Sequence, residues 1–150
     1  GIPLVDSNRF IDNPPRSRNE KLASFMRRIN ICEERGSGWD KIILFCEKEQ
    51  IPAPKIQIYK ESTKIYLFSF VPFNKLSHEE KLWSCYMHTC LKYVCNERMT
   101  NNSLRERFGL KVSNKASVSR LIKEAVSKNI IKPLDPYTAS RYISYILYWA

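Results

Sequence analysis

The sequence predicts an α+β fold in two parts, residues 1–74 and 75–150. Three observations support this prediction. Two segments with apolar residues at helical spacing precede two strand-like runs in the first part. The second part begins with a long helical stripe and ends in an aromatic, β-branched tail. A chain of 150 residues has room for one domain or two small ones, and the segment 71–76, VPFNKL, fits the boundary between them.

Two helices and a hairpin are expected in the first part. Ser17 and Glu20 have the spacing of a capping box, so a helix should begin there. Its apolar face is formed by Leu22, Phe25, Met26 and Ile29. The pattern breaks at Gly36 and Gly38 and resumes in a second helix, whose apolar residues are Trp39, Ile42, Ile43 and Cys46. Residues 55–60 and 64–71 then read as two strands joined by a turn.

Three helices and a strand are expected in the second part. Ser77 and Glu80 form a second capping box that opens a long helix. Thr100 fits the N-cap of a short helix that Gly109 closes. Ser113 fits the N-cap of a third helix, which ends near Asn129. The tail RYISYILYWA reads as a strand.

This order of elements is that of a winged helix-turn-helix, in which the third helix reads DNA. On the third helix, the positions outside the apolar stripe carry polar and basic residues that could contact bases and phosphates. These are Asn114, Lys115, Ser117, Arg120 and Lys123. Arg105 and Arg107 on the preceding helix are expected to touch the DNA backbone. A solvated helix face and a protein-binding winged helix remain as alternatives.

The charge of the chain agrees with a partner such as double-stranded DNA. The net charge is +10, with 13 basic and 9 acidic residues in 1–75 and 12 and 6 in 76–150. Such an excess attracts polyanions, although a basic surface that only keeps the protein soluble stays open. The aromatic tail offers another partner, because Tyr142, Tyr145, Tyr148 and Trp149 could pack a homodimer. Plain core packing is the simpler interpretation of that tail.

Other classes of function find little support in the sequence. No segment is apolar enough for a membrane span and no signal pattern is present, which favours a cytoplasmic protein without a membrane partner. Of the five cysteines, Cys85, Cys90 and Cys95 share one helical run with His88, but their spacing spreads them around the helix, and we expect no metal site. With only two histidines, we expect no catalytic residues.

Several motifs occur in the order typical of one family. They are NPPRSRNEKLASFMRR, ICEERGSGWDKII, IPAPKIQIY, KIYLFSF and NNSLRERFG. Together they resemble the RecG-like ATP-dependent helicase C-terminal family, over most of the chain. The resemblance implies a bacterial ATP-binding transcriptional regulator. Such regulators typically carry an AlbA-type (Schlafen-like) DNA-binding domain, a divergent GHKL ATPase-like domain and often a winged helix. No GxxxxGK[ST] loop of a helicase motor is present.

The resemblance also implies a nucleotide-binding loop in this chain. Arg35, Gly36, Ser37 and Gly38 correspond to the last glycine box of a GHKL site, where a helix N-terminus faces phosphates. The chain then begins partway through that domain, without the segments that bind magnesium and adenine. Asp40 also lies in the first turn of the expected helix, where its carboxylate already interacts with the positive end of the helix dipole that a phosphate would need. We therefore expect a turn and a helix start here, no cofactor in this chain, and ATP with Mg²⁺ only in the intact protein.

Overall fold

The computed structural model describes residues 3–33, 37–139 and 142–150, and it confirms the α+β class. The described helices are α1 (Glu20–Arg28), α2 (Ser37–Lys48), α3 (His78–Val94), α4 (Asn101–Arg107) and α5 (Lys115–Ser127). The strands are β1 (Lys55–Ile58), β2 (Thr63–Tyr66), β3 (Ile131–Pro133) and β4 (Tyr145–Leu147). Three single 3₁₀ turns, at Ser7–Arg9, Phe73–Lys75 and Val112–Asn114, complete the described secondary structure.

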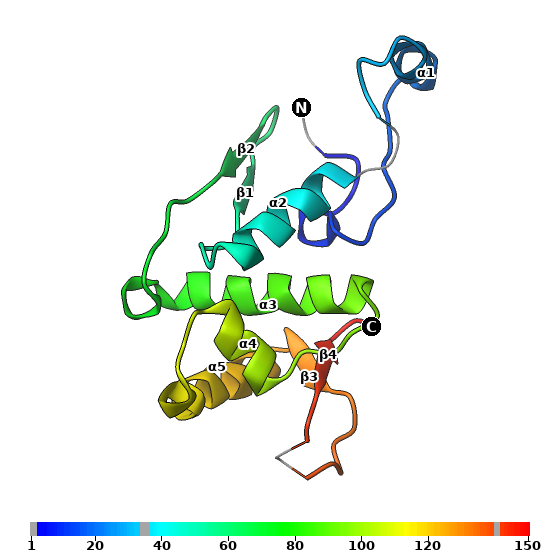
Figure 1. Ribbon diagram of the computed structural model, residues 1–150. Helices are drawn as coiled ribbons and strands as arrows, with labels where there is room; N and C mark the ends of the chain where they lie inside the picture. Colours follow the sequence, from blue (N-terminus) through cyan, green and yellow to red (C-terminus); the bar gives the residue numbers. More distant parts are fainter. Residues whose placement is uncertain (1–2, 34–36, 140–141) are drawn as a thin grey trace.

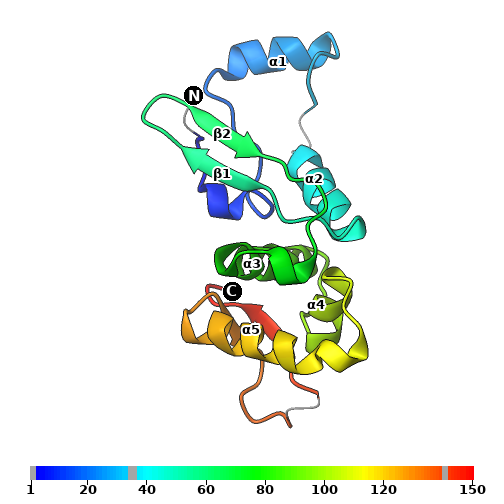
Figure 2. The ribbon, with the colours of Figure 1, turned by 90° about the vertical axis from the view of Figure 1, so that its left-hand side faces the viewer.

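Helix α3 lies in the middle of the molecule (Figures 1 and 2). Helices α4 and α5 and strands β3 and β4 lie on one side of it, and α2 and the β1–β2 hairpin lie on the other. Two buried clusters meet α3. The first contains Leu82 and Cys85 of α3 with Leu104 of α4 and Leu121 of α5. The second contains the following residues from both parts of the chain: Ile11, Ile43, Ala53, Met87, Cys90 and Leu147. The two parts therefore share a core along α3, and their separation into two domains stays a prediction.

Local side-chain signals set the helix starts, as the sequence suggests. The box at Ser77 is confirmed, because Glu80 accepts a hydrogen bond from the Ser77 backbone N–H at 2.7 Å and the Ser77 hydroxyl accepts one from the Glu80 N–H at 3.2 Å. Thr100 also caps α4 as predicted. Two starts are corrected. The N-cap of α1 is Asn19, whose side chain accepts from the Leu22 N–H. The N-cap of α5 is Asn114, because Ser113 lies inside a preceding 3₁₀ turn.

All five described helices end the same way. The second residue after each has a left-handed backbone with φ between 54° and 62°, namely Asn30, Gln50, Asn96, Gly109 and Asn129. The N–H of this left-handed residue and the N–H of the next residue donate to carbonyls of the last helical turn. At the end of α5, for example, the Ile130 N–H donates to the Ala125 carbonyl at 2.9 Å. This is the Schellman termination, which satisfies carbonyls that the helix end leaves unpaired. Gly109 and Asn129 end their helices as predicted.

The strands form two separate antiparallel pairs. β1 pairs with β2 over a register that runs from Lys55 opposite Tyr66 to Ile58 opposite Thr63. β3 pairs with β4, with Ile131 opposite Leu147. The tail strand is confirmed, whereas β3, which follows the predicted end of the third helix at Asn129, was not predicted. The short β3 gives little sequence signal, and its pairing with β4 is what defines it.

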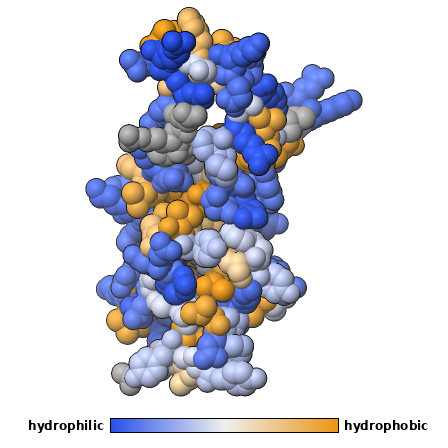
Figure 3. All heavy atoms as spheres, turned by 90° about the vertical axis from the view of Figure 1, so that its right-hand side faces the viewer, coloured by the Kyte–Doolittle hydropathy of each residue, from blue (hydrophilic) through white to orange (hydrophobic). Residues whose placement is uncertain are grey.

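The first helix differs from the other four in its packing. Helix α1 forms as predicted, yet it buries none of its residues, and its predicted apolar face, Leu22, Phe25 and Ile29, is about half exposed. In Figures 1 and 2 it lies at the end of the molecule far from α3. Figure 3 shows hydrophobic side chains near the middle of the face it views and others among hydrophilic ones at the α1 end.

Replacing Glu80 with alanine should destabilise the fold by about 1 kcal/mol at neutral pH, the usual size of a lost helix cap. The bonds from Ser77 lower the pKa of Glu80 below its ordinary value. Because the pKa of Glu80 is lower in the folded than in the unfolded protein, the stabilisation by its cap is fully present above the unfolded-state pKa. It is lost as the pH falls through the folded-state pKa. The difference between wild type and Glu80→Ala in urea unfolding should therefore shrink between neutral pH and about pH 3. Glu79→Ala is the control, because Glu79 lies beside it in the same turn without a bond to Ser77.

Candidate functional site

A basic surface lies on the exposed face of α5. Lys115, Arg120 and Lys123 are exposed there. They surround a shallow hollow of about 570 Å³, whose described lining is completed by Ser113, Ala116 and Ser119 and contains no acidic side chain. We call these six residues the α5 surface. Cations and small hydroxyl side chains around a hollow can hold phosphate oxygens.

The opposite face of α5 fixes this surface to the rest of the molecule. Val118, Leu121, Ile122 and Ala125 are buried at helical spacing, which turns the basic positions toward solvent. Asn101 of α4 adds a polar link, because its Nδ2 donates to the Lys115 carbonyl at 3.2 Å and to the Ser119 hydroxyl at 2.9 Å. Helix α4 thus holds the first turns of α5 in place.

The structure brings together only some of the residues predicted for DNA contact. Lys115, Arg120 and Lys123 share the α5 surface, whereas Asn114 and Ser117 are half-buried and do not line it. Ser117 accepts a weak hydrogen bond from Arg120 at 3.4 Å. Sequence reasoning treated Ser113 as a cap and overlooked Ala116 and Ser119. The spacing of four between Lys115, Ser119 and Lys123 was the available signal.

The acid on α5 is engaged by its own neighbours. Glu124 accepts from Lys128 at 2.8 Å and contacts His78 of α3. Lys128, and then His78, lower the pKa of Glu124. Glu124 therefore stays ionised and paired beside the α5 surface.

Arg107 corrects one prediction. Its side chain is only 1% exposed, and its guanidinium donates to Glu47 of α2 at 2.6 Å and to the Ile51 carbonyl at 2.6 Å. Arg105 is also buried. Arg107 is committed to this internal ion pair, and neither arginine lies exposed where the DNA backbone could reach it.

The same ion pair is part of a buried network. Glu47 also accepts a hydrogen bond from His88 at 2.7 Å, and the other ring nitrogen of His88 lies 3.0 Å from the Ser103 hydroxyl. An acid, a histidine and a serine in line are the pattern of a nucleophile site. Ser103, however, belongs to the α4 capping box, where its hydroxyl accepts from the Thr100 N–H and donates to the Thr100 carbonyl. The serine is held as a helix cap, so the network is structural.

The buried cysteines have unreactive thiols. Cys85 and Cys90 lie within the cores, and burial raises the pKa of each thiol to about 12. A thiol with so high a pKa is protonated at neutral pH and packs as a small apolar group. The described residues contain no cluster of three or more His, Cys, Asp or Glu side chains that could hold a metal ion.

The glycine loop is described only in part. Arg35 and Gly36 lie outside the described residues, while Ser37 begins α2 and Gly38 follows in its first turn. A Cβ at Gly38 would meet no atom within 4 Å. Asp40 lies in the same turn, where burial raises its pKa. The absence of a cofactor from this loop therefore stays a prediction.

Replacing Gly38 with alanine should raise the free energy of unfolding by up to about 1 kcal/mol. The residue is helical, the space around its Cβ is open, and alanine loses less backbone entropy than glycine in a helix. Urea unfolding measures the change, and Gly109→Ala is the contrasting variant. Gly109 has φ +62°, and an added Cβ would lie 2.3 Å from the Gln50 side-chain oxygen, so that variant should be less stable. A destabilised Gly38→Ala would contradict the described helix start.

The comparisons with known proteins agree with the sequence motifs in the first part. Residues 1–67 match the model of the family described as "Putative ATP-dependent DNA helicase recG C-terminal". The match covers less than half of the chain, and it shows that this first part is similar to the RecG-like C-terminal family. No curated protein and no solved structure matches the chain. Within the described residues, no helix combines the length and apolarity needed to cross a membrane.

Proposed function

We propose that residues 75–150 form a winged helix that binds double-stranded DNA through the α5 surface. In this proposal the protein is a transcriptional regulator in which the helical part follows the RecG-like segment. The observation that supports it most is the α5 surface itself, which gathers three exposed cations on one face of one helix. DNA binding needs such an electrostatic footprint.

The arrangement of elements gives further support. Helices α3, α4 and α5 are followed by the antiparallel pair β3–β4, which would be the wing (Figure 1). The described part of the β3–β4 connection carries Asp135 and the fully exposed Tyr137, so its contribution to phosphate binding would be small. The helix would therefore supply most of the affinity.

Fluorescence anisotropy with a labelled duplex of random sequence tests the proposal. Affinity should fall steeply between about 50 and 200 mM salt, because bound cations release counterions from DNA. Arg120→Glu with Lys123→Glu should weaken binding roughly 100-fold, since two phosphate contacts become repulsive. The double variant Lys48→Glu with Lys60→Glu is the control. It makes the same change in net charge at exposed positions outside the α5 surface.

Equal loss of affinity in both double variants would show that only net charge matters and would reject the α5 surface. Absence of binding at low salt would reject DNA binding by this part. It would favour the protein-contact alternative, in which exposed aromatic residues such as Tyr142 and Tyr148 meet a partner or a second copy.

ATP binding by the full-length protein is the second candidate, and the family match favours it. Gly38 and the N-terminus of α2 would contribute backbone N–H groups to phosphate binding. Calorimetric titration of ATP into the full-length protein, against a Gly38→Asp variant, tests this role. Equal affinity in the two proteins would exclude the loop.

A further inference from the structure

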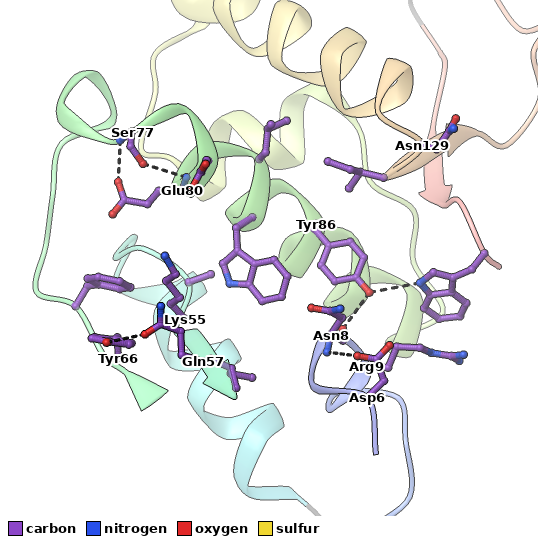
Figure 4. A pocket seen from close by; sticks show the side chains of 18 residues that line it. Asp6, Asn8, Arg9, Lys55, Gln57, Tyr66, Ser77, Glu80, Tyr86 and Asn129 are labelled. Atoms are coloured by element: carbon purple, nitrogen blue, oxygen red, sulfur yellow. Dashed lines mark hydrogen bonds between the residues drawn. The ribbon is translucent and has the colours of Figure 1, made fainter. Parts of the chain in front are cut away.

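A cavity of about 940 Å³ lies between the two parts of the chain, away from the α5 surface. Its walls come from the N-terminal arm, the β1–β2 hairpin, α3, the end of α5 and the C-terminus. Figure 4 shows Lys55, Gln57 and Tyr66 together on one side and Asn8, Arg9 and Tyr86 together on the other. The volume is in the range of small-molecule sites, which usually combine an apolar wall with a few polar groups.

Three aromatic rings in this cavity are held in place by their polar atoms. The indole N–H of Trp83 donates to the Pro54 carbonyl at 2.8 Å. The Tyr86 hydroxyl donates to the Asn8 carbonyl at 3.0 Å and accepts from the indole N–H of Trp149 at 3.4 Å. Trp83 and Tyr86 stack with their centroids 5.4 Å apart. The Arg9 guanidinium lies 4.0 Å from the centroid of the Trp149 ring and covers it. Because the indole N–H of Trp83 is also occupied, the ring face of Trp83 turned away from Tyr86 is what this residue can offer a ligand.

Most charged groups of the lining are also engaged. Asp6 accepts from the Asn8 N–H at 2.9 Å, Glu80 belongs to the capping box, and Arg9 pairs with Asp12 at 2.5 Å. Lys55 and Glu79 have no ion-pair partner among the described residues. The described lining thus carries three carboxylates against two cations, one of which is already paired with Asp12, so it disfavours an anionic ligand. Lys55 can still donate a charge-assisted hydrogen bond.

The amide of Gln57 adds a second donor beside Lys55. Its oxygen accepts from the Tyr59 hydroxyl at 2.9 Å and the Tyr66 hydroxyl at 2.8 Å. The NH₂ group of the same amide remains available to a ligand acceptor. Donors gather on the hairpin side, and the stacked rings lie on α3.

We propose that this cavity binds an uncharged planar aromatic molecule that carries a hydrogen-bond acceptor. The ring system stacks on Trp83, and its acceptor takes a hydrogen bond from Lys55. Aromatic rings prefer offset stacking against a flat partner, and a saturated ring cannot supply the same contact. This site is independent of DNA binding by α5 and of ATP binding at Gly38.

The test titrates two matched lactams into the ¹⁵N-labelled chain. 2-Quinolone is planar, whereas octahydro-2-quinolone carries the same carbonyl acceptor on a saturated ring. The indole N–H signals of Trp83 and Trp149 should shift with 2-quinolone, while that of Trp39, which lies outside the cavity, should not. The saturated lactam should bind about tenfold more weakly. Equal affinity for the two lactams, equal shifts of all three indoles, or no shift would overturn the proposal.

Two variants locate the contacts. Trp83→Leu should weaken 2-quinolone binding about tenfold through the lost ring face. Lys55→Met should also weaken 2-quinolone binding about tenfold, because the charged donor is lost. The substitution should leave the fold intact, since Lys55 is exposed. Trp39→Phe, outside the cavity, should bind as the wild type does. Wild-type affinity in Lys55→Met would remove the hairpin from the site and overturn the proposal.

Discussion

Glu47→Leu is expected to lower the free energy of unfolding by about 3–5 kcal/mol, the usual cost of removing one partner of a buried ion pair. Glu47 is 12% exposed and Arg107 is 1% exposed, so water cannot replace the lost carboxylate at the guanidinium. His88 loses the acceptor of its ring N–H at the same time. Few single changes in this chain should cost more.

Urea unfolding of Glu47→Leu beside Glu49→Leu makes the comparison. Glu49 lies two residues further along and is exposed, so its replacement should change stability by no more than about 0.5 kcal/mol. The double variant Glu47→Leu with Arg107→Met should recover much of the loss, because two apolar side chains can replace a buried pair. It should not recover all of it, since His88 remains without its acceptor. Equal effects of Glu47→Leu and Glu49→Leu would contradict the buried pair.

The pair also explains how α2 and α4 are joined. Arg107 donates to the Ile51 carbonyl, and the side-chain NH₂ of Gln50 donates to the Glu106 carbonyl at 3.1 Å. Gly109 lies against the end of this side chain, since a Cβ there would lie 2.3 Å from the Gln50 Oε1, and its φ of +62° disfavours any larger residue. The end of α2, within the segment that matches the RecG-like family, is thereby fixed to the short helix before α5.

The sequence predicted what local information determines. The capping signals at Ser77 and Thr100 and the ends at Gly109 and Asn129 involve residues within a few positions of one another, and each is where the pattern put it. The errors at Ser17 and Ser113 are of one to two residues, because the Asn19 side chain caps α1 and a 3₁₀ turn that contains Ser113 precedes α5.

The sequence did not predict what depends on distant partners. Arg107 looked like a surface cation because its partner Glu47 is 60 residues away. Trp83 and Tyr86 looked like part of an apolar stripe, and nothing local indicates that Trp149 and the N-terminal arm meet them at a cavity. On α5 the sequence placed the three cations on one outward face, but it did not indicate that Ser119 lies among them. Ser119 joins the α5 surface through Asn101, a residue of another helix.

Leu147→Ala is expected to destabilise the fold by about 2–5 kcal/mol, the range for truncating a buried leucine. The side chain is fully buried in β4 and packs in the cluster that also contains Ile43, Met87 and Cys90. The matched control is Tyr148→Ala, because the next residue is about half exposed and its loss leaves no internal cavity.

The same experiment separates core packing from dimerisation of the tail. If the tail serves the core of one chain, the urea midpoint of the wild type is independent of protein concentration, and only Leu147→Ala lowers it strongly. If two chains share the tail, the midpoint rises with concentration, because association stabilises the folded state by mass action. Tyr148→Ala would then destabilise as much as Leu147→Ala, since an exposed aromatic residue would be buried by the partner. Tyr145 already packs against the core, and its backbone bonds to Met99 in both directions, which favours the first outcome.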